Sequence, residues 1–229
     1  MTRPLDPAPP RRIQRNLLAS GEKRLLAWLC PRLPAWVTPD GLTALALLSA
    51  VAIGLGYALS TWNPWWLALS VAGYFTHWFG DSLDGTIARY RRVERPRYGY
   101  FIDHSCDGLA TLLILGGLGV SPYLQVEVAL FAVVAYLLMS VHTFLLAKVA
   151  GEFPLSHLGA GPTELRIVLI ALTVIMGFLG PDVGRVAGFN GFDILFTALA
   201  TLLVVLFMVQ TVREGRTLAA LDRGSQKIR

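Results

Sequence analysis

The chain has 229 residues, of which 54% are hydrophobic and only 15% are charged, and its mean hydropathy is +0.55. Soluble domains are about 45–50% apolar and about 25% charged, so this composition favours an integral membrane protein. The formal net charge of +5 does not indicate a nucleic-acid partner, because the basic residues flank apolar segments and form no face interleaved with aromatic residues.

Residues 1–36 are expected to form a cytosolic or interfacial N-terminal segment. Within it, residues 11–29 mix leucine with arginine and lysine. This mixture is typical of an amphipathic helix that lies on an anionic membrane surface. A partly disordered basic leader is the alternative.

Residues 37–229 are expected to form an all-α domain of six transmembrane helices with a short cytosolic C-terminal tail. Several apolar runs begin with a capping residue followed by proline, a pair that suits the first turn of a helix. The six expected spans are residues 38–59, 63–79, about 99–118, 121–149, 161–180 and 192–212.

The distribution of lysine and arginine predicts the orientation of these spans. Basic residues accumulate in cytoplasmic loops, and with the N-terminus inside they sort to one side, leaving only Arg185 outside. The expected location is therefore a membrane, taken to be a bacterial inner membrane, with both termini on the cytosolic side.

Four aspartates lie at the cytosolic ends of the second and third spans. Asp81 and Asp84 are one turn apart, as are Asp103 and Asp107, so each pair shares a helix face. A rise of about 1.5 Å per residue places both pairs near the same membrane surface, where four carboxylates can converge. A divalent cation would relieve their mutual repulsion, because carboxylate oxygens are ligands that Mg²⁺ and Mn²⁺ prefer.

The alternative is an ion-pair network with the arginines between these spans, Arg89, Arg91, Arg92, Arg95 and Arg97. The helical spacing of the acids and the small residues beside them favour a metal site, since intramembrane acids are commonly functional. His77 and its neighbouring tryptophans are attributed to an interfacial aromatic belt.

These residues form the pattern Asp81-x2-Asp84-Gly85-x2-Ala88-Arg89-x9-Gly99-x3-Asp103-x3-Asp107. The pattern resembles the signature of the CDP-alcohol phosphotransferase family at all eight fixed positions. The resemblance implies the family's six-span fold with an N-terminal surface helix, and a homodimer. It also implies transfer of a phosphoalcohol group from a CDP-alcohol to the hydroxyl of a second alcohol, with release of CMP, in phospholipid synthesis.

The same resemblance implies a role for each residue of the motif. The metal ligands, for two Mg²⁺ or Mn²⁺ ions, would be Asp81, Asp84, Asp103 and Asp107, with Asp107 also the general base. The CDP substrate would be bound by Asp84, Gly85, Ala88, Arg89 and Gly99. The candidates for binding the acceptor are Glu164, Arg166 and His104, although His104, next to Asp103, is expected to face another side of the helix.

The donor stays open between two branches of the family. The run Asp103-His104-Ser105-Cys106-Asp107 and the element Gly161-Pro162-Thr163-Glu164 are similar to motifs of members that use CDP-choline or CDP-ethanolamine with diacylglycerol. The length of the chain instead favours members that use CDP-diacylglycerol with a polyol or serine.

Two other classes of protein place acids in a membrane. An intramembrane prenyltransferase acting on a polyprenyl diphosphate also uses aspartates and Mg²⁺, but it gives no reason for the Gly-x2-Ala-Arg element. A divalent-cation transporter needs acids near the bilayer midplane with a path to both sides, whereas these acids are expected at one edge.

Overall fold

The structure is a computed structural model that describes residues 11–13, 18–150, 152–154 and 161–226. The α-helices in these residues are α1 (Ala19–Leu29), α2 (Pro39–Leu59), α3 (Leu67–Arg91), α4 (Pro96–Gly119), α5 (Val126–Ala150), α6 (Pro162–Leu179) and α7 (Gly191–Gln226). The shorter elements are the 3₁₀ turns η1 (Cys30–Arg32) and η2 (Pro64–Trp66) and the strands β1 (Arg11–Ile13) and β2 (Glu152–Pro154), which pair in parallel.

Proline and capping residues set the helix starts that the sequence predicts best. At the start of α2, the Thr38 hydroxyl accepts a hydrogen bond from the Gly41 backbone N–H at 3.1 Å. At the start of α6, Glu164 accepts one from the Gly161 backbone N–H at 3.0 Å. Because these local bonds satisfy free backbone donors, both helices begin where expected.

Other boundaries differ from the expected spans. α5 begins at Val126 and not at Ser121, because Ser121 forms a turn in which its hydroxyl donates to the Leu118 carbonyl at 2.6 Å. α3 begins only after η2 and continues without a break to Arg91, and α7 continues to Gln226. The residues after the sixth expected span are therefore helical as far as they are described.

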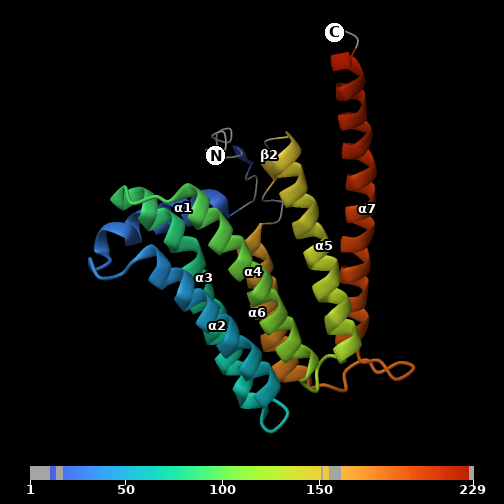
Figure 1. Cartoon of the computed structure of the whole chain (residues 1–229). Coiled ribbons are helices and arrows are strands. Elements are labelled where there is room, and N and C mark those ends of the chain that lie inside the picture. The colour runs from blue at the N-terminus through green and yellow to red at the C-terminus, as the bar shows by residue number, and fades with distance from the viewer. Residues whose placement is uncertain (1–10, 14–17, 151, 155–160, 227–229) are drawn as a thin grey trace, which may run out of the picture.

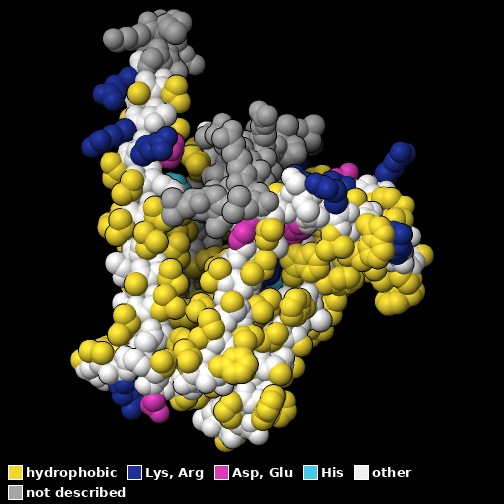
Figure 2. All heavy atoms as spheres, turned by 180° about the vertical axis from the view of Figure 1, so that it is seen from behind, with side chains coloured by type: hydrophobic (Ala, Val, Ile, Leu, Met, Phe, Trp, Pro, Cys, Tyr) yellow, Lys and Arg dark blue, Asp and Glu magenta, His cyan; other side chains and the backbone are white. Residues whose placement is uncertain are grey.

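Five of the described helices are long and apolar enough to cross a membrane: α2, α4, α5, α6 and α7. The chain is thus an all-helical integral membrane protein, and Figure 2 shows hydrophobic side chains over most of the described helical wall. The remaining expected span lies in α3, where His77, two aspartates and two arginines lower the hydropathy. Its crossing stays a prediction.

The helices that carry the acids both pack against α2 (Figure 1). α2 and α4 approach so closely that a Cβ added to Gly117 would lie 2.3 Å from the Cα of Gly54. Glycine at these positions lets the two backbones touch, as in other membrane helix pairs. Farther along the bundle, α5 packs between α4 and α7, and α6 packs on α3.

The N-terminal helix is shorter than expected. α1 begins at Ala19, residues 11–13 are extended, and residues 14–17 lie outside the described part of the chain. α1 packs on α2 and α3 through Leu26, which belongs to a buried cluster with Leu42 and Leu83. Its interfacial, amphipathic character stays a prediction, as does the domain boundary at residue 36.

The carboxylate of Glu22 also holds α1 in place. Glu22 Oε1 accepts hydrogen bonds from Trp78 Nε1 at 2.9 Å, Ser82 Oγ at 3.0 Å and Thr163 Oγ1 at 2.8 Å. These donors come from α3 and α6, so α1 is fixed at the end of the bundle where Asp81 lies.

Candidate active site

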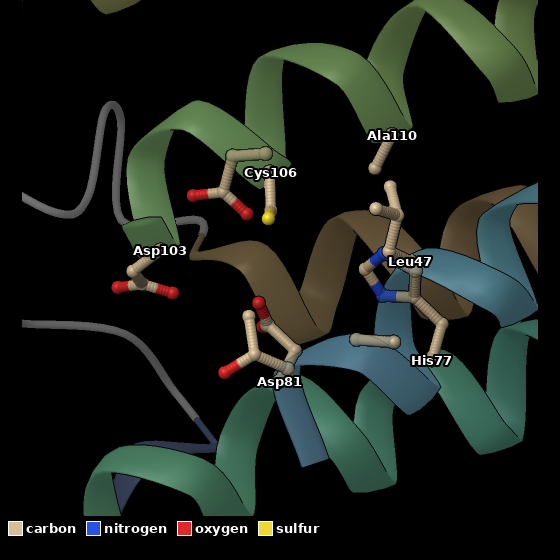
Figure 3. A pocket seen from close by; sticks show the side chains of 9 residues that line it. Leu47, His77, Asp81, Asp103, Cys106 and Ala110 are labelled. Carbon is tan, nitrogen blue, oxygen red and sulfur yellow. The ribbon is translucent and has the colours of Figure 1, made fainter. Parts of the chain in front are cut away.

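Three of the four predicted aspartates lie together. One carboxylate oxygen from each of Asp81, Asp103 and Asp107 lies within 4.8 Å of the others, and all three residues are half-buried. Asp81 comes from α3 and the other two from α4; Figure 3 shows Asp81 and Asp103 on either side of one space. Hard divalent cations prefer oxygen ligands, so this set of donors fits Mg²⁺ or Mn²⁺.

The fourth aspartate is bonded elsewhere. Asp84 Oδ2 accepts a hydrogen bond from Thr43 Oγ1 of α2 at 2.6 Å, and its Oδ1 accepts one from the Gly85 backbone N–H at 2.5 Å. Asp84 therefore stands next to the group of three without belonging to it. The sequence spacing predicted its helix face but not the threonine that α2 brings against it.

The positive charge beside the acids comes from α6. Arg166 Nη2 lies 2.5 Å from Asp81 Oδ2, and their side chains are only 13% and 20% exposed. This places Arg166, an expected acceptor-binding residue, directly at the carboxylates.

The arginines at the end of α3 and in the turn before α4 make other contacts. Arg89 donates to Thr86 Oγ1 at 3.2 Å, and Arg91 donates to four backbone carbonyls, those of Leu33, Pro34, Ala35 and Val37. Arg95 pairs with Asp40, and this hydrogen bond raises the pKa of Arg95. These three arginines thus hold the ends of α2 and α3, and the described contacts do not support the predicted alternative of a network between them and the acids.

His104 does not face away from the acids, and that expectation is wrong. Its Nδ1 lies 3.5 Å from Asp107 Oδ2 and 3.9 Å from Asp103 Oδ2. Residues three apart on a helix are neighbours, which brings the imidazole beside Asp107. Tyr100 and Phe144 flank the ring, with centroids 4.4 Å and 5.2 Å away, and so fix its position between α4 and α5.

The remaining predicted residues lie around this centre. Glu164 is placed at the start of α6, where its Oε1 also accepts from the Leu18 backbone N–H at 2.9 Å. A Cβ added to Gly99 would meet no atom within 4 Å, and one added to Gly85 would meet only the Arg89 guanidinium, at 3.4 Å and beyond. Described packing therefore does not fill the space beside these glycines, while Ala88 is half-buried and Arg89 is exposed.

A pocket connects the carboxylates with an apolar end. It is lined by Thr43, Ala46, Leu47, His77, Asp81, Asp103, Cys106, Asp107 and Ala110. His77 is thus a pocket residue and not part of an aromatic belt; its spacing of four from Asp81 was the signal that it shares the acidic face. Thr43 gave no such signal, because its position depends on how α2 packs on α3.

Sequence comparisons relate this chain to known proteins. The family model of CDP-alcohol phosphatidyltransferases matches residues 36–212. Cholinephosphotransferase 1 of Gallus gallus is 26% identical over 200 residues, which are 79% of this chain and 58% of the relative. The Homo sapiens protein of that name is also 26% identical over 200 residues (79% and 48%), and the Danio rerio one is 32% identical over 96 residues (39% and 25%).

The aligned part spans at most 58% of the length of these relatives. They come from animals, so they do not fit the expected bacterial inner membrane. The match of the family model covers most of the chain, and it includes the motif from Asp81 to Asp107 and the helices that bring its acids together. The chain therefore belongs to the CDP-alcohol phosphatidyltransferase family.

Proposed function

We propose that the protein transfers phosphocholine or phosphoethanolamine from the CDP-alcohol to diacylglycerol and releases CMP. The observation that carries this proposal is the convergence of Asp81, Asp103 and Asp107 in a chain of this family. The choice of an amino-alcohol donor is supported by the run from Asp103 to Asp107 and by relatives named cholinephosphotransferase. CDP-diacylglycerol with a polyol or serine is the alternative pair.

Asp81, Asp103 and Asp107 would hold Mg²⁺ or Mn²⁺, which supplies positive charge to the diphosphate and to the departing CMP. A second ion would draw on Asp84, whose two oxygens each accept a hydrogen bond and keep a further lone pair. Arg166, paired with Asp81, limits the repulsion among the carboxylates.

In the transfer, the acceptor's hydroxyl oxygen attacks the phosphorus that bears the alcohol, and the bond from this phosphorus to the CMP oxygen breaks. Asp107 accepts the hydroxyl proton as the new phosphorus–oxygen bond forms. His104, next to Asp107, orients this carboxylate. Proximity of the carboxylate to the hydroxyl makes the proton transfer effectively intramolecular.

The substrates would enter from two phases. The open space beside Gly85 and Gly99 suits the nucleotide, with Ala88 small enough to leave room and Arg89 near the diphosphate. Among the acceptor candidates, His104 and Arg166 lie at the carboxylates. Glu164 accepts hydrogen bonds from the Leu18 and Gly161 backbone N–H groups and would instead fix the start of α6.

We also propose that α3 crosses the membrane, which gives six spans with the site on the cytosolic side. A helix of 25 residues is about 37 Å long, which exceeds the roughly 30 Å of the hydrocarbon layer. α1 and the C-terminal end of α7 lie at one end of the bundle in Figure 1, as an even number of spans requires. The exposed side of α1, which includes Leu25 and Trp28, would rest on the membrane surface. The family resemblance supports a homodimer.

A panel of substrates tests this assignment. The purified full chain in lipid nanodiscs is incubated with CDP-choline or CDP-ethanolamine plus diacylglycerol, and separately with CDP-diacylglycerol plus glycerol phosphate, inositol or serine. Released CMP is measured. CMP release in the first series is expected. CMP release only in the second series would show that the donor is CDP-diacylglycerol, and no CMP release in either series would overturn the proposed function.

A further inference from the structure

His77 carries a polar atom that nothing in the described structure satisfies. The residue is 6% exposed and lines the pocket, and its Nδ1 is buried with no hydrogen-bond partner among the described residues. Buried polar groups in folded proteins are nearly always hydrogen-bonded, because leaving one unpaired costs free energy. The atom therefore calls for a partner that the polypeptide itself does not supply.

The position of His77 indicates where that partner comes from. His77 precedes Asp81 by four residues on α3, or about 6 Å along the helix. Ala110 follows Asp107 by three residues on α4, which runs antiparallel to α3. His77 and Ala110 therefore both lie one turn from the carboxylates, in the same direction along the bundle. Figure 3 shows His77 beside Leu47 and Ala110, at the end of the pocket away from Asp103. This end is apolar apart from the imidazole.

A purely structural histidine is a weaker explanation. His142 is also buried, at 8% exposure, and its Nδ1 lies 3.3 Å from Thr211 Oγ1 of α7. That contact links α5 to α7 and uses the ring as interhelical bonds in membranes usually do. His77 makes no comparable contact through Nδ1, although Asp81, which pairs with Arg166, lies only one turn away along α3.

We propose that His77 binds an oxygen of the glycerol unit of a diacyl lipid substrate, a hydroxyl or an ester carbonyl. This inference rests on the proposed function. A neutral imidazole offers one donor and one acceptor, which matches these oxygens, while Ala46, Leu47 and Ala110 contact the start of an acyl chain. With its glycerol unit at His77, the lipid presents its reacting end to Asp107. Diacylglycerol and CDP-diacylglycerol share the glycerol unit, so the subsite serves either donor assignment.

Substitution of His77 separates lipid binding from catalysis. In full-length protein in nanodiscs, His77→Leu is expected to raise the KM for diacylglycerol about five- to tenfold, the effect of one lost hydrogen bond. The KM for CDP-choline is expected to change less than about twofold, and His77→Gln, which keeps a hydrogen-bonding amide, recovers part of the loss. If CDP-diacylglycerol is the donor, the increase appears in its KM instead. His142→Leu, outside the pocket, leaves both KM values unchanged.

Unchanged KM values for every diacyl lipid, or a fall in kcat alone, would overturn the subsite. Binding of a fluorescent diacylglycerol without any donor distinguishes this failure from failure of the proposed function. If the wild-type protein turns over no substrate pair but His77→Leu binds the lipid more weakly than the wild type, the proposed function is rejected and the subsite is kept. Equal lipid binding by the wild type and His77→Leu would reject the subsite. If His77→Leu does not fold, the same comparison is made with His77→Gln.

Discussion

Asp107 combines two contacts that bear on proton transfer. One of its oxygens lies in the group formed with Asp81 and Asp103, and its Oδ2 lies 3.5 Å from His104. The first contact would place it at the metal and the second fixes the orientation of the carboxylate. Asp107 also lines the pocket, so a hydroxyl bound there lies within reach of this base.

The variant Asp107→Asn tests this role. At saturating Mg²⁺ it is expected to lower kcat about 10²- to 10⁴-fold, because the amide cannot accept the hydroxyl proton. The affinity for CDP-choline, measured by calorimetry, is expected to persist. Ser105→Ala is the matched control, since Ser105 is an exposed residue of the same helix. In the described contacts its hydroxyl donates only to the backbone carbonyl of Phe101, one turn earlier in α4. Retained turnover in Asp107→Asn would remove Asp107 from the base role.

The site was predictable from the sequence where helix periodicity decides the geometry. The spacing within α3 and α4 predicted that four aspartates converge, and three of them, Asp81, Asp103 and Asp107, do so. The Thr43–Asp84 and Arg166–Asp81 contacts could not be predicted, because they depend on how α2 and α6 pack on α3.

At the scale of the helices, the α2–α4 contact positions the carboxylates of α4 relative to those of α3. The backbones meet at Gly54 and Gly117, and the carbonyl of Leu113 would lie 2.4 Å from a Cβ added to Gly54. Any side chain here must push α2 and α4 apart.

Gly117→Ala is therefore expected to destabilise the protein by about 1–3 kcal/mol, the usual cost of overpacking a close contact. It should also lower the thermal midpoint measured in detergent. The control is Gly116→Ala, at the preceding position of the same helix, where an added Cβ meets nothing within 4 Å. Equal midpoints for the two variants would show that the close approach of α2 and α4 does not contribute to stability.

The helix boundaries show the same division between local and distant causes. The starts of α2 and α6 were predictable, because proline and a nearby capping side chain act within one turn. The start of α5 was missed, since Ser121 and Tyr123 form a turn with the end of α4. The extent of α3 to Arg91 was also missed, because the arginine there is held by carbonyls that precede α2.

At the scale of the whole molecule, the number of membrane crossings between two exposed residues decides the topology. Thr61, in the loop after α2, and Arg216, on α7, are both exposed. If α3 crosses the membrane, five helices separate these residues and they lie on opposite sides. If α3 does not cross, four helices separate them and they lie on the same side.

Cysteine labelling distinguishes these arrangements. Thr61→Cys and Arg216→Cys are made separately in a chain with Cys30 and Cys106 replaced by serine. In intact cells, an impermeant maleimide is expected to label the first variant, and to label the second only after permeabilisation. Labelling of both in intact cells would contradict six spans, and labelling of Arg216→Cys alone would reverse the orientation.

The central claim is that Asp81, Asp103 and Asp107 form a divalent-cation site that drives transfer from a CDP-alcohol. The most direct test is CMP release from CDP-choline and diacylglycerol by the wild-type chain and Asp103→Asn, with chelator and after addition of Mg²⁺ or Mn²⁺. The wild type should lose CMP release in chelator and regain it with the ion, while Asp103→Asn stays inactive. CMP release that resists chelation, or wild-type rates in Asp103→Asn, would contradict the claim.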